Sequence, residues 1–448
     1  MIALTITWLI LSLVSAIDIA DYNYINTFSI LLWFLSCLIF IRKNSEFGIL
    51  SVFFLIAFSS SGAINVYAEN NVWMSEIQRV TYLTGSTTRI LCCAYFLMIG
   101  SYVFFTSTSV IKFIYSSLSD SVNKFARHSS LIIILSIIFL LIAVRAIYGS
   151  PNDHGMDRFD YWEKVAPSWA GYCKFILQHL SMLMGVMYAT TKKRMYIYLI
   201  AMSLAAQILV GDKFSGMYIS VLFFMIPVVI INGIDLWKKL FTTKIIAGSI
   251  VFVCILITTT YLSYYAISGG GDAIGKLTNR IVLQSQMWWA VDADSSGHML
   301  SIQAILTNML GFGADKTESG IRYLMYITAP YNLWSIFMDR DVTFTMASPV
   351  NYIFFFGFPL SVLASFIFGI MMGFAFRVIS DSLKSKDVFL SVVSAKLYYI
   401  LISVYTMGDV NLIFDIKSLL CVASFFVYSL ISCFINRNNI TTRGSNGA

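Results

Sequence analysis

The sequence predicts an all-α polytopic membrane protein with about 12 transmembrane helices. Of its 448 residues, 58% are hydrophobic and 12% are charged, whereas soluble domains have about 25% charged residues. Apolar segments close to the bilayer-crossing length of about 20 residues recur along the chain. Basic residues gather in alternate loops between these segments, as in membrane proteins of fixed orientation.

The candidate membrane helices are apolar segments bounded by polar or charged residues. They cover residues 2–18, 26–41, 47–64, 88–106, 129–148, 173–190, 195–210, 215–233, 245–265, 350–376, 388–407 and 411–434. The first has no basic residues before it and no convincing cleavage site, so we interpret it as a retained helix rather than a signal peptide.

The basic residues predict which loops face the cytoplasm. The loops that carry them also alternate along the chain, as a correct helix count requires. These residues are Arg42, Lys43, Lys112, Lys124, Arg127, Lys192, Lys193, Arg194, Lys238, Lys239, Lys244, Arg377, Lys384, Lys386, Arg437 and Arg443. Both termini are therefore predicted to be cytoplasmic. The net charge of +7 lies in these loops, so no nucleic-acid partner is expected.

Four regions follow from this topology. Residues 1–267 hold helices 1–9, with outer loops near 65–87 and 149–172. Residues 268–349 form a large outer segment, here called the loop module, which we expect to be helical or irregular. Helices 10–12 occupy 350–436, and 437–448 is a cytoplasmic tail.

Within the loop module, residues 281–290 and 301–310 are predicted helices. The first carries Trp288 and Trp289 and is expected along the membrane interface. Asp292 and Asp294 are interpreted as a polar turn, and His298 is a candidate general base. The sequence GGDAIGK at 270–276 is rejected as a phosphate-binding loop because it lacks the following Ser or Thr.

Basic side chains on the predicted outer face are the candidate anion site. Each could pair locally with an acid, whereas together they suit a pyrophosphate headgroup. They are Arg145, Arg158, Lys164, Lys213, Lys276, Arg280, Arg322 and Arg340. Lys213 lies in the short turn GDKFSG, whose glycines allow close approach to a ligand or only a local pair with Asp212.

The outer loop at 149–172 offers carboxylates and aromatic rings. Asp153, Asp157 and Asp160 would share a helical face, and one of them could accept a proton from a sugar hydroxyl. Tyr161 could stack on a sugar ring, while Trp162 is expected to anchor the loop. These oxygens leave a divalent-metal site open as an alternative, but their spacing matches no Ca²⁺ loop, so no metal is predicted.

Lys396 lies near the middle of the eleventh predicted helix. We expect it to face the bundle interior, paired with Asp409 or Asp415, either in a structural ion pair or in a substrate cavity. The seven cysteines lie in or beside apolar segments, which indicates no disulfide framework.

The helix count, the two outer loops and the GDKFSG turn together resemble the bacterial O-antigen polymerase (Wzy-type) family of integral membrane glycosyltransferases. The resemblance implies a GT-C-like fold in the inner membrane with a periplasmic active site. There a growing glycan on undecaprenyl pyrophosphate is transferred to a new lipid-linked repeat unit. It implies no cofactor and no metal. Membrane lipids and a chain-length regulator protein are the further partners considered.

The resemblance also suggests roles for individual residues. Catalysis is assigned to Asp160, His298 and Arg280, and binding of pyrophosphate or glycan to Arg158, Lys213, Arg322, Arg340, Tyr161 and Lys396. An O-antigen ligase is an alternative, which His298 and Arg280 leave open. A flippase or other transporter is disfavoured by the large loop module and the lack of an internal repeat. A membrane acyltransferase is disfavoured because no HxxxD motif is apparent.

Overall fold

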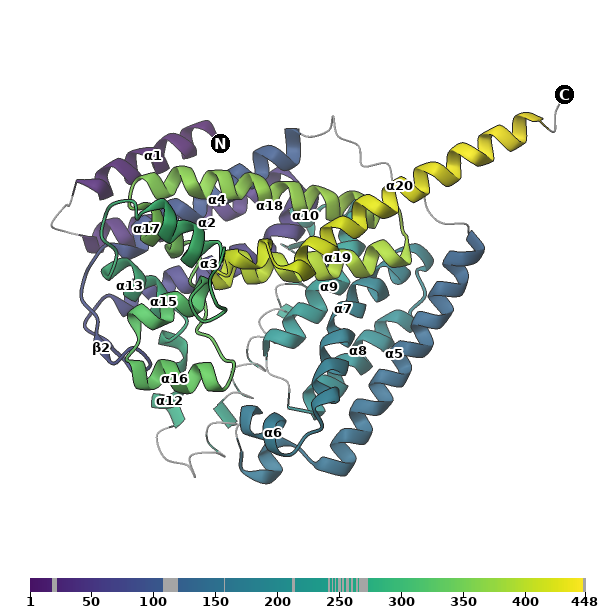
Figure 1. Cartoon of the computed structure of the whole chain (residues 1–448), viewed down its shortest axis with the longest axis horizontal. Coiled ribbons are helices and arrows are strands. Elements are labelled where there is room, and N and C mark those ends of the chain that lie inside the picture. The colour runs from purple at the N-terminus through teal and green to yellow at the C-terminus, as the bar shows by residue number, and fades with distance from the viewer. Residues whose placement is uncertain are drawn as a thin grey trace. The chain divides into compact units, whose positions relative to one another are not determined.

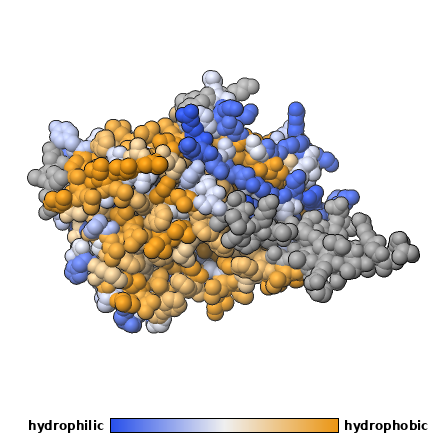
Figure 2. All heavy atoms as spheres, turned by 90° about the horizontal axis from the view of Figure 1, so that it is seen from above, coloured by the Kyte–Doolittle hydropathy of each residue, from blue (hydrophilic) through white to orange (hydrophobic). Residues whose placement is uncertain are grey.

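The computed structural model describes residues 1–17, 22–107, 120–156, 158–211, 214–240 and 273–445, with isolated residues between 242 and 265. Most of these residues are helical, and many apolar side chains lie on the surface (Figure 2). Six described helices are long and apolar enough to cross a membrane: Asn23–Lys43, Ser45–Ala68, Ser86–Ser107, Asn123–Tyr148, Leu360–Lys384 and Val388–Met407. The all-α membrane architecture is thus confirmed, while the predicted helix at 245–265 lies mostly outside the described residues.

The chain divides into two compact units, each built from separate stretches of sequence. The first comprises Met1–Val110, Ile274–Arg377 and Tyr399–Leu419. The second comprises Ile111–Ala273, Val378–Tyr398 and Leu420–Ala448. Most of the loop module therefore belongs to the first unit, together with the N-terminal helices.

The N-terminal part of the first unit is a group of four helices and a short hairpin. Its elements are α1 (Ile2–Ala16), α2 (Tyr22–Lys43), α3 (Ser45–Ala68), β1 (Trp73–Met74), β2 (Arg79–Val80) and α4 (Ser86–Ser107). Helix α2 packs against α3 and α4, and α1 packs against α4 (Figure 1). The break between α2 and α3 falls at Asn44, whose side chain accepts a hydrogen bond from Phe47 N at 3.0 Å and so caps α3.

The described part of the loop module is helical, as expected. Its elements are α12 (Ala273–Val282), α13 (Gln286–Ala293), α14 (Ile302–Ala304), the π-helical turn η3 (Ile305–Met309), α15 (Gly320–Thr328) and α16 (Tyr331–Asp339). The helix predicted at 281–290 is instead divided between the end of α12 and the start of α13. Residues 302–309 confirm the second predicted helix in position, with a π-helical turn in place of regular α-helix.

Trp288 and Trp289 do not lie at the membrane interface, which corrects the prediction. They are 0% and 1% exposed, because α13 packs against α3, α4 and α17 (Val350–Phe356). Both indole N–H groups have internal acceptors: Trp288 Nε1 donates to the Ser348 carbonyl at 3.2 Å, and Trp289 Nε1 to the Tyr82 carbonyl at 2.9 Å. Large rings can therefore be buried here with their polar atoms satisfied.

The predicted helix at 350–376 is two helices, α17 and α18 (Leu360–Lys384). The break follows Gly357, which has a φ of +70° and whose missing Cβ would lie 2.7 Å from His298 Cα. Pro359 then removes a backbone N–H. Farther along α18, Gly369 and Gly373 bring the helix against the backbone of α4.

The C-terminal elements are α19 (Val388–Ile402), the π-helical turn η4 (Ser403–Met407), the 3-10 helix η5 (Val410–Ile413) and α20 (Ile416–Ser445). The last helix, predicted from residue 411, therefore starts at Ile416. The loop between η4 and η5 belongs to the first unit.

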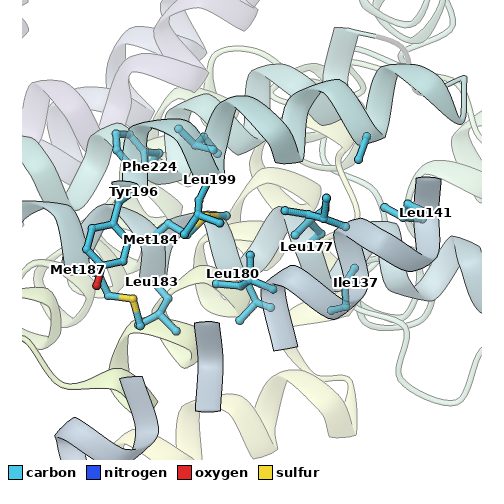
Figure 3. Close-up of a cluster of buried hydrophobic side chains, with 14 of the residues drawn as sticks. Ile137, Leu141, Leu177, Leu180, Leu183, Met184, Met187, Tyr196, Leu199 and Phe224 are labelled. Carbon is cyan, nitrogen blue, oxygen red and sulfur yellow. The ribbon is translucent and has the colours of Figure 1, made fainter. Parts of the chain in front are cut away.

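The second unit is a helical bundle. Besides the end of α18 and most of α19 and α20, it holds α5 (Asp120–Tyr148), the 3-10 helix η2 (Pro151–His154), α6 (Arg158–Lys164), α7 (Ser168–Thr191), α8 (Met195–Leu209), α9 (Phe214–Asn232) and α10 (Leu236–Leu240). Figure 3 shows its core, where α7 presents a stripe of apolar residues at helical spacing. These residues are Leu177, Leu180, Leu183, Met184 and Met187, and they meet Ile137, Leu141, Tyr196, Leu199 and Phe224.

Candidate functional site

A polar cluster at the start of α15 gathers residues from three segments of the first unit. Two segments flank α15 and α16, and the third is the loop that follows η4. We call it the Arg322 cluster; its members are Lys316, Ser319, Arg322, Asp341, Asp409 and Asn411. These residues lie up to 95 positions apart in the chain, so the fold of the first unit is what brings them together.

Two cations of this cluster converge on one carboxylate oxygen. Lys316 Nζ lies 3.2 Å from Oδ1 of Asp341, and Arg322 Nη2 donates to the same oxygen. The Arg322 side chain is 13% exposed, whereas the side chain of Asp341 is 71% exposed. A mostly buried guanidinium and an ammonium thus hold an anionic oxygen at the surface.

Helix α16 fixes the position of Arg322. Trp334 Nε1 donates to the Arg322 carbonyl at 3.3 Å. The Trp334 ring also contacts those of Tyr326 and Tyr331, with centroid distances of 5.2 and 5.5 Å. Because these contacts hold α15 against α16, the guanidinium is positioned before any ligand binds.

Asp409 lies at the first turn of α15. Its Oδ1 accepts a hydrogen bond from Ile321 N at 3.2 Å. Burial raises the pKa of the Asp409 carboxyl above its usual value of 3.8, and the Ile321 N–H and the charges of Arg322 and Lys316 oppose that rise. Beside it, Asn411 Nδ2 donates to Ser319 Oγ at 3.0 Å.

Asp292, on α13, and Asp294, directly after it, are ion-paired rather than arranged as a metal site. Arg89 pairs with Asp292, and Arg79 Nη1 lies 2.7 Å from Asp294 Oδ1. Burial raises the pKa of Asp292, and the charge of Arg89 opposes the rise. Among the described residues, no group of three His, Cys, Asp or Glu side chains has the arrangement of a metal site.

Arg280 is held by a neighbouring acid. Its Nη1 lies 3.5 Å from Oε1 of Glu76, which also accepts a hydrogen bond from Gln286 Nε2. Burial raises the pKa of Glu76, while the bond from Gln286 and the charge of Arg280 oppose it. Arg280 is half exposed, with 50% of its side chain accessible, so it faces solvent from an ion pair.

Glu69, which sequence reasoning did not single out, is the centre of a buried hydrogen-bond network. It is 1% exposed and lies just after α3. Its two carboxylate oxygens accept hydrogen bonds from side chains of three helices and from backbone N–H groups just before and at the start of α4. The donors are Asn26 Nδ2, Asn65 Nδ2, Ser86 Oγ, Thr87 Oγ1, Thr84 N, Gly85 N and Thr87 N. Because both carboxylate oxygens already accept several hydrogen bonds, we interpret Glu69 as a structural residue.

The loop that follows α5 in the second unit is not one continuous helix. Asp153 lies in η2, and Gly155, at a φ of +60°, separates η2 from α6, which carries Asp160. The two acids therefore do not share a helical face, and Asp157 lies outside the described residues. Asp153 pairs with Arg145, and Asp160 Oδ1 lies 3.0 Å from Lys164 Nζ.

Tyr161 is 0% exposed and serves as an internal brace. Its hydroxyl donates to the Gly149 carbonyl at 2.9 Å, and its ring meets that of Trp162 edge-on at 5.7 Å. This placement favours anchoring of the loop over stacking on a sugar. Arg158 begins α6.

The other predicted site residues lie in separate surroundings. His298 is exposed, and its Nδ1–H donates to the Ser296 carbonyl at 2.9 Å. Arg340 is exposed at the end of α16, directly before Asp341 in the chain. Lys213 lies outside the described residues.

Lys396 lies in the helical bundle of the second unit. Its Nζ is 5.4 Å from the ring centroid of Phe175, a cation–π contact with α7. The Phe175 ring in turn lies 4.2 Å from that of His179. Asp409, one of its predicted partners, instead accepts the hydrogen bond from Ile321 N.

Among the residues assigned from the sequence, the structure places Arg322 in the cluster and Arg340 next to it in the chain. Lys316 and Asp341 were missed, and Asp409 was considered only as a partner of Lys396. Two local signals mark these positions: Gly320 follows Ser319, and Gly408 precedes Asp409, at φ angles of +61° and +87°. Glycine at such turns allows two backbone segments to approach closely.

A family model matches part of the chain. A family described as of unknown function (DUF6418) matches residues 314–422, a segment that includes every member of the Arg322 cluster. The match covers less than half of the chain, and its description carries no activity. Neither the curated proteins nor the solved structures gave a match.

Proposed function

We propose that this protein is a glycan polymerase of the bacterial inner membrane, working on the periplasmic side. It would transfer a growing glycan from undecaprenyl pyrophosphate to a hydroxyl of a new lipid-linked repeat unit. The observation that carries the proposal is the convergence of Lys316 and Arg322 on one carboxylate oxygen of Asp341. That oxygen stands in for an oxygen of the pyrophosphate.

The chemistry of the leaving group explains why two cations are useful. The bond between the anomeric carbon and the phosphate oxygen breaks, and the pyrophosphate departs with both electrons. Cations held in place beforehand stabilise that charge without reorganising during the reaction. Arg322 offers parallel N–H donors from a buried position, and Lys316 adds a compact charge that is 71% exposed and can follow the ligand.

The surroundings of the cluster suit a lipid-linked substrate. The loop module lies in the chain between helices that are long and apolar enough to cross a membrane. Tyr326, Tyr331 and Ile336, on α15 and α16, are 53%, 69% and 49% exposed. Exposed aromatic and aliphatic side chains of this kind favour contact with a bilayer surface, where the polyprenyl chain of the substrate is anchored.

The finer elements of the resemblance stay predictions. These are the count of twelve helices, the GT-C-like class, the orientation, the partners, and the roles assigned to Asp160, His298, Arg280, Arg158, Lys213, Arg340, Tyr161 and Lys396. The contacts of the Arg322 cluster support one part of the proposal, the binding of the pyrophosphate by Arg322 and Lys316.

The test is the lipopolysaccharide pattern of a gene-deletion strain complemented with single variants. Arg322→Ala is expected to lose the ladder of long glycans, because loss of one charge-stabilising donor lowers turnover by about 10²–10³-fold. Lys316→Ala should shorten the ladder. The matched controls are Arg79→Ala and Lys238→Ala, which also remove a cation paired with an aspartate but lie outside the cluster. Both controls should keep the wild-type ladder at equal protein levels in the membrane.

The deletion strain itself separates the candidate functions. A core capped by a single repeat unit supports the polymerase. Loss of all glycan-capped bands with accumulation of lipid-linked polymer indicates a ligase instead. Single repeats trapped on the cytoplasmic leaflet indicate a flippase. An unchanged ladder in the deletion strain, or in the Arg322→Ala strain, rejects the proposal.

A further inference from the structure

The loop after η4 brings two acceptor oxygens to the same point at the start of α15. Gly320 has a φ of +61°, and a Cβ built on it would lie 2.8 Å from Asp409 Oδ1 and 2.8 Å from Asn411 Oδ1. The two oxygens are therefore close neighbours, and both face the chain just before Arg322. Any side chain at position 320 would occupy this space.

The position of this loop is tightly defined. Asp409 N donates to the Ser403 carbonyl at 3.3 Å, and Asp409 Oδ1 accepts from Ile321 N. Gly408, at a φ of +87°, packs so closely on Ala347 that an added Cβ would lie 3.0 Å from the Ala347 Cβ. The carboxylate is thus held by backbone contacts on both sides, as a reacting group needs to be.

Asn411 supplies an independent indication of a ligand. Its Nδ2 donates to Ser319 Oγ at 3.0 Å. Its Oδ1 is buried and accepts no hydrogen bond from the residues that the structure describes. Because buried acceptors normally have a donor, we expect this one to bind a donor from a ligand. A sugar carries hydroxyl donors on neighbouring ring carbons.

We infer that Asp409 is the general base of the reaction, taking the proton from the attacking hydroxyl of the acceptor repeat unit, while Asn411 Oδ1 binds a neighbouring hydroxyl of the same sugar. This inference rests on the proposed function. It assigns the acceptor side of the site to Asp409 and Asn411 and the donor side to Arg322 and Lys316.

The step balances as a single displacement. The acceptor O–H bond breaks and its proton moves to the Asp409 carboxylate, while the acceptor oxygen forms a bond to the anomeric carbon of the donor glycan. The bond from that carbon to the pyrophosphate oxygen breaks, and undecaprenyl pyrophosphate leaves as an anion beside Arg322 and Lys316. The proton on Asp409 then passes to solvent or to the departing pyrophosphate.

The electrostatics of the carboxyl fit this role. Burial raises the pKa of Asp409, and the nearby cations and the Ile321 N–H limit that rise. A carboxylate with a raised pKa is a stronger base than an exposed aspartate. Activity should therefore decline as the pH falls through a value above the usual range of an aspartate.

Asp409→Asn separates this role from a merely structural one. The asparagine keeps Oδ1 and so can still accept the hydrogen bond from Ile321 N, but it cannot take up the proton. We expect an unchanged melting temperature, unchanged binding of undecaprenyl pyrophosphate in detergent micelles, and a rate of polymer formation lower by about 10²–10⁴-fold. The acidic decline of the pH profile should vanish from the residual activity, and Asp409→Glu should recover part of the rate.

Two results overturn the inference. One is an Asp409→Asn rate within about tenfold of wild type, with the pH profile unchanged. The other is an Asp409→Asn protein that loses undecaprenyl pyrophosphate binding, or whose melting temperature falls as much as that of Asp409→Ala. Either loss would make the residue structural. Failure of the proposed function looks different: either the parent protein itself forms no polymer, or Arg322→Ala keeps both binding and polymer formation, whatever the Asp409 variants do.

Discussion

Arg89 and Asp292 form a buried, bidentate ion pair between α4 and α13. Arg89 Nε donates to Asp292 Oδ1 at 3.0 Å, and Nη2 donates to Oδ2. Their side chains are 17% and 1% exposed. Because Arg89 Nη2 also donates to the Thr84 carbonyl at 2.9 Å, the pair fastens the loop module to the start of an apolar helix.

Breaking this pair should destabilise the protein strongly. Asp292→Ala leaves the charge of Arg89 in a mostly buried site, so we expect a loss of about 3–5 kcal/mol in unfolding free energy. Asp294→Ala is the matched control, since its partner Arg79 is 40% exposed and such pairs contribute about 0–1 kcal/mol. Thermal unfolding in detergent, followed by tryptophan fluorescence, measures both. Equal losses at the two sites would contradict the role given to burial.

The hydrogen-bond network around Glu69 predicts that replacing one carboxylate oxygen with an NH₂ group destabilises the folded protein. Glu69→Gln keeps the size of the side chain but replaces an accepting oxygen with an NH₂ group that faces several donors. Because buried polar groups are then left without partners, we expect a loss of at least about 2 kcal/mol. Glu163→Gln, at an exposed position, should change stability by no more than about 0.5 kcal/mol. A Glu69→Gln protein with the melting temperature of the parent would show that the network is dispensable.

The contact of α18 with α4 depends on the absence of side chains. A Cβ at Gly369 would collide with the Leu97 carbonyl, and one at Gly373 with that of Ser101. Gly369→Ala should therefore force the helices apart and lower the yield of folded protein, measured by size-exclusion chromatography in detergent. Gly171→Ala, a helical position where no described residue lies within 4 Å of the added Cβ, should be neutral or slightly stabilising. A higher yield of folded protein for Gly369→Ala than for Gly171→Ala would contradict close packing at this contact.

The loop after α5 should resist acid. The Arg145 guanidinium lowers the pKa of Asp153 from its usual value of 3.8 to about 2. A lowered pKa means that the pair stabilises the folded loop above pH 3.8 and that this contribution is lost as the pH falls from 3.8 towards 2. Hydrogen exchange at Gly149 and Ser150, corrected for its intrinsic pH dependence, should stay constant from pH 7 to pH 4.5. Asp153→Ala should raise it throughout that range, whereas a rise near pH 6 in the parent would contradict the assignment.

Sequence reasoning succeeded where hydrophobicity alone decides the outcome. The long apolar segments became α2, α3, α4, α5, α18 and α19, because the need to remove apolar surface from water acts on each segment separately. The interruption at Pro359 was foreseeable from the residue itself. The paired glycines at 369 and 373 also carry the small-residue spacing of close helix contacts, a signal that the sequence analysis did not use.

The partners of the charged residues could not be predicted. Arg322 pairs with Asp341, 19 positions away, and its charge acts on Asp409, 87 positions away, while Arg280 pairs with Glu76, 204 positions away. Such pairs depend on how separate segments pack, and the charges themselves have no periodicity that reveals it. For the same reason, Trp288 and Trp289 could be expected at an interface, although their N–H groups find acceptors in the core.

The network around Glu69 also bears on how the protein enters the membrane during synthesis. Asn26 and Asn65 leave the ribosome before or with Glu69, but Ser86 and Thr87 follow later. Until they arrive, the Glu69 carboxyl at the end of α3 has only part of its partners and must remain in contact with water. We therefore expect α2, α3 and α4 to be released by the insertion machinery as a group, with the first turn of α4 closing the assembly.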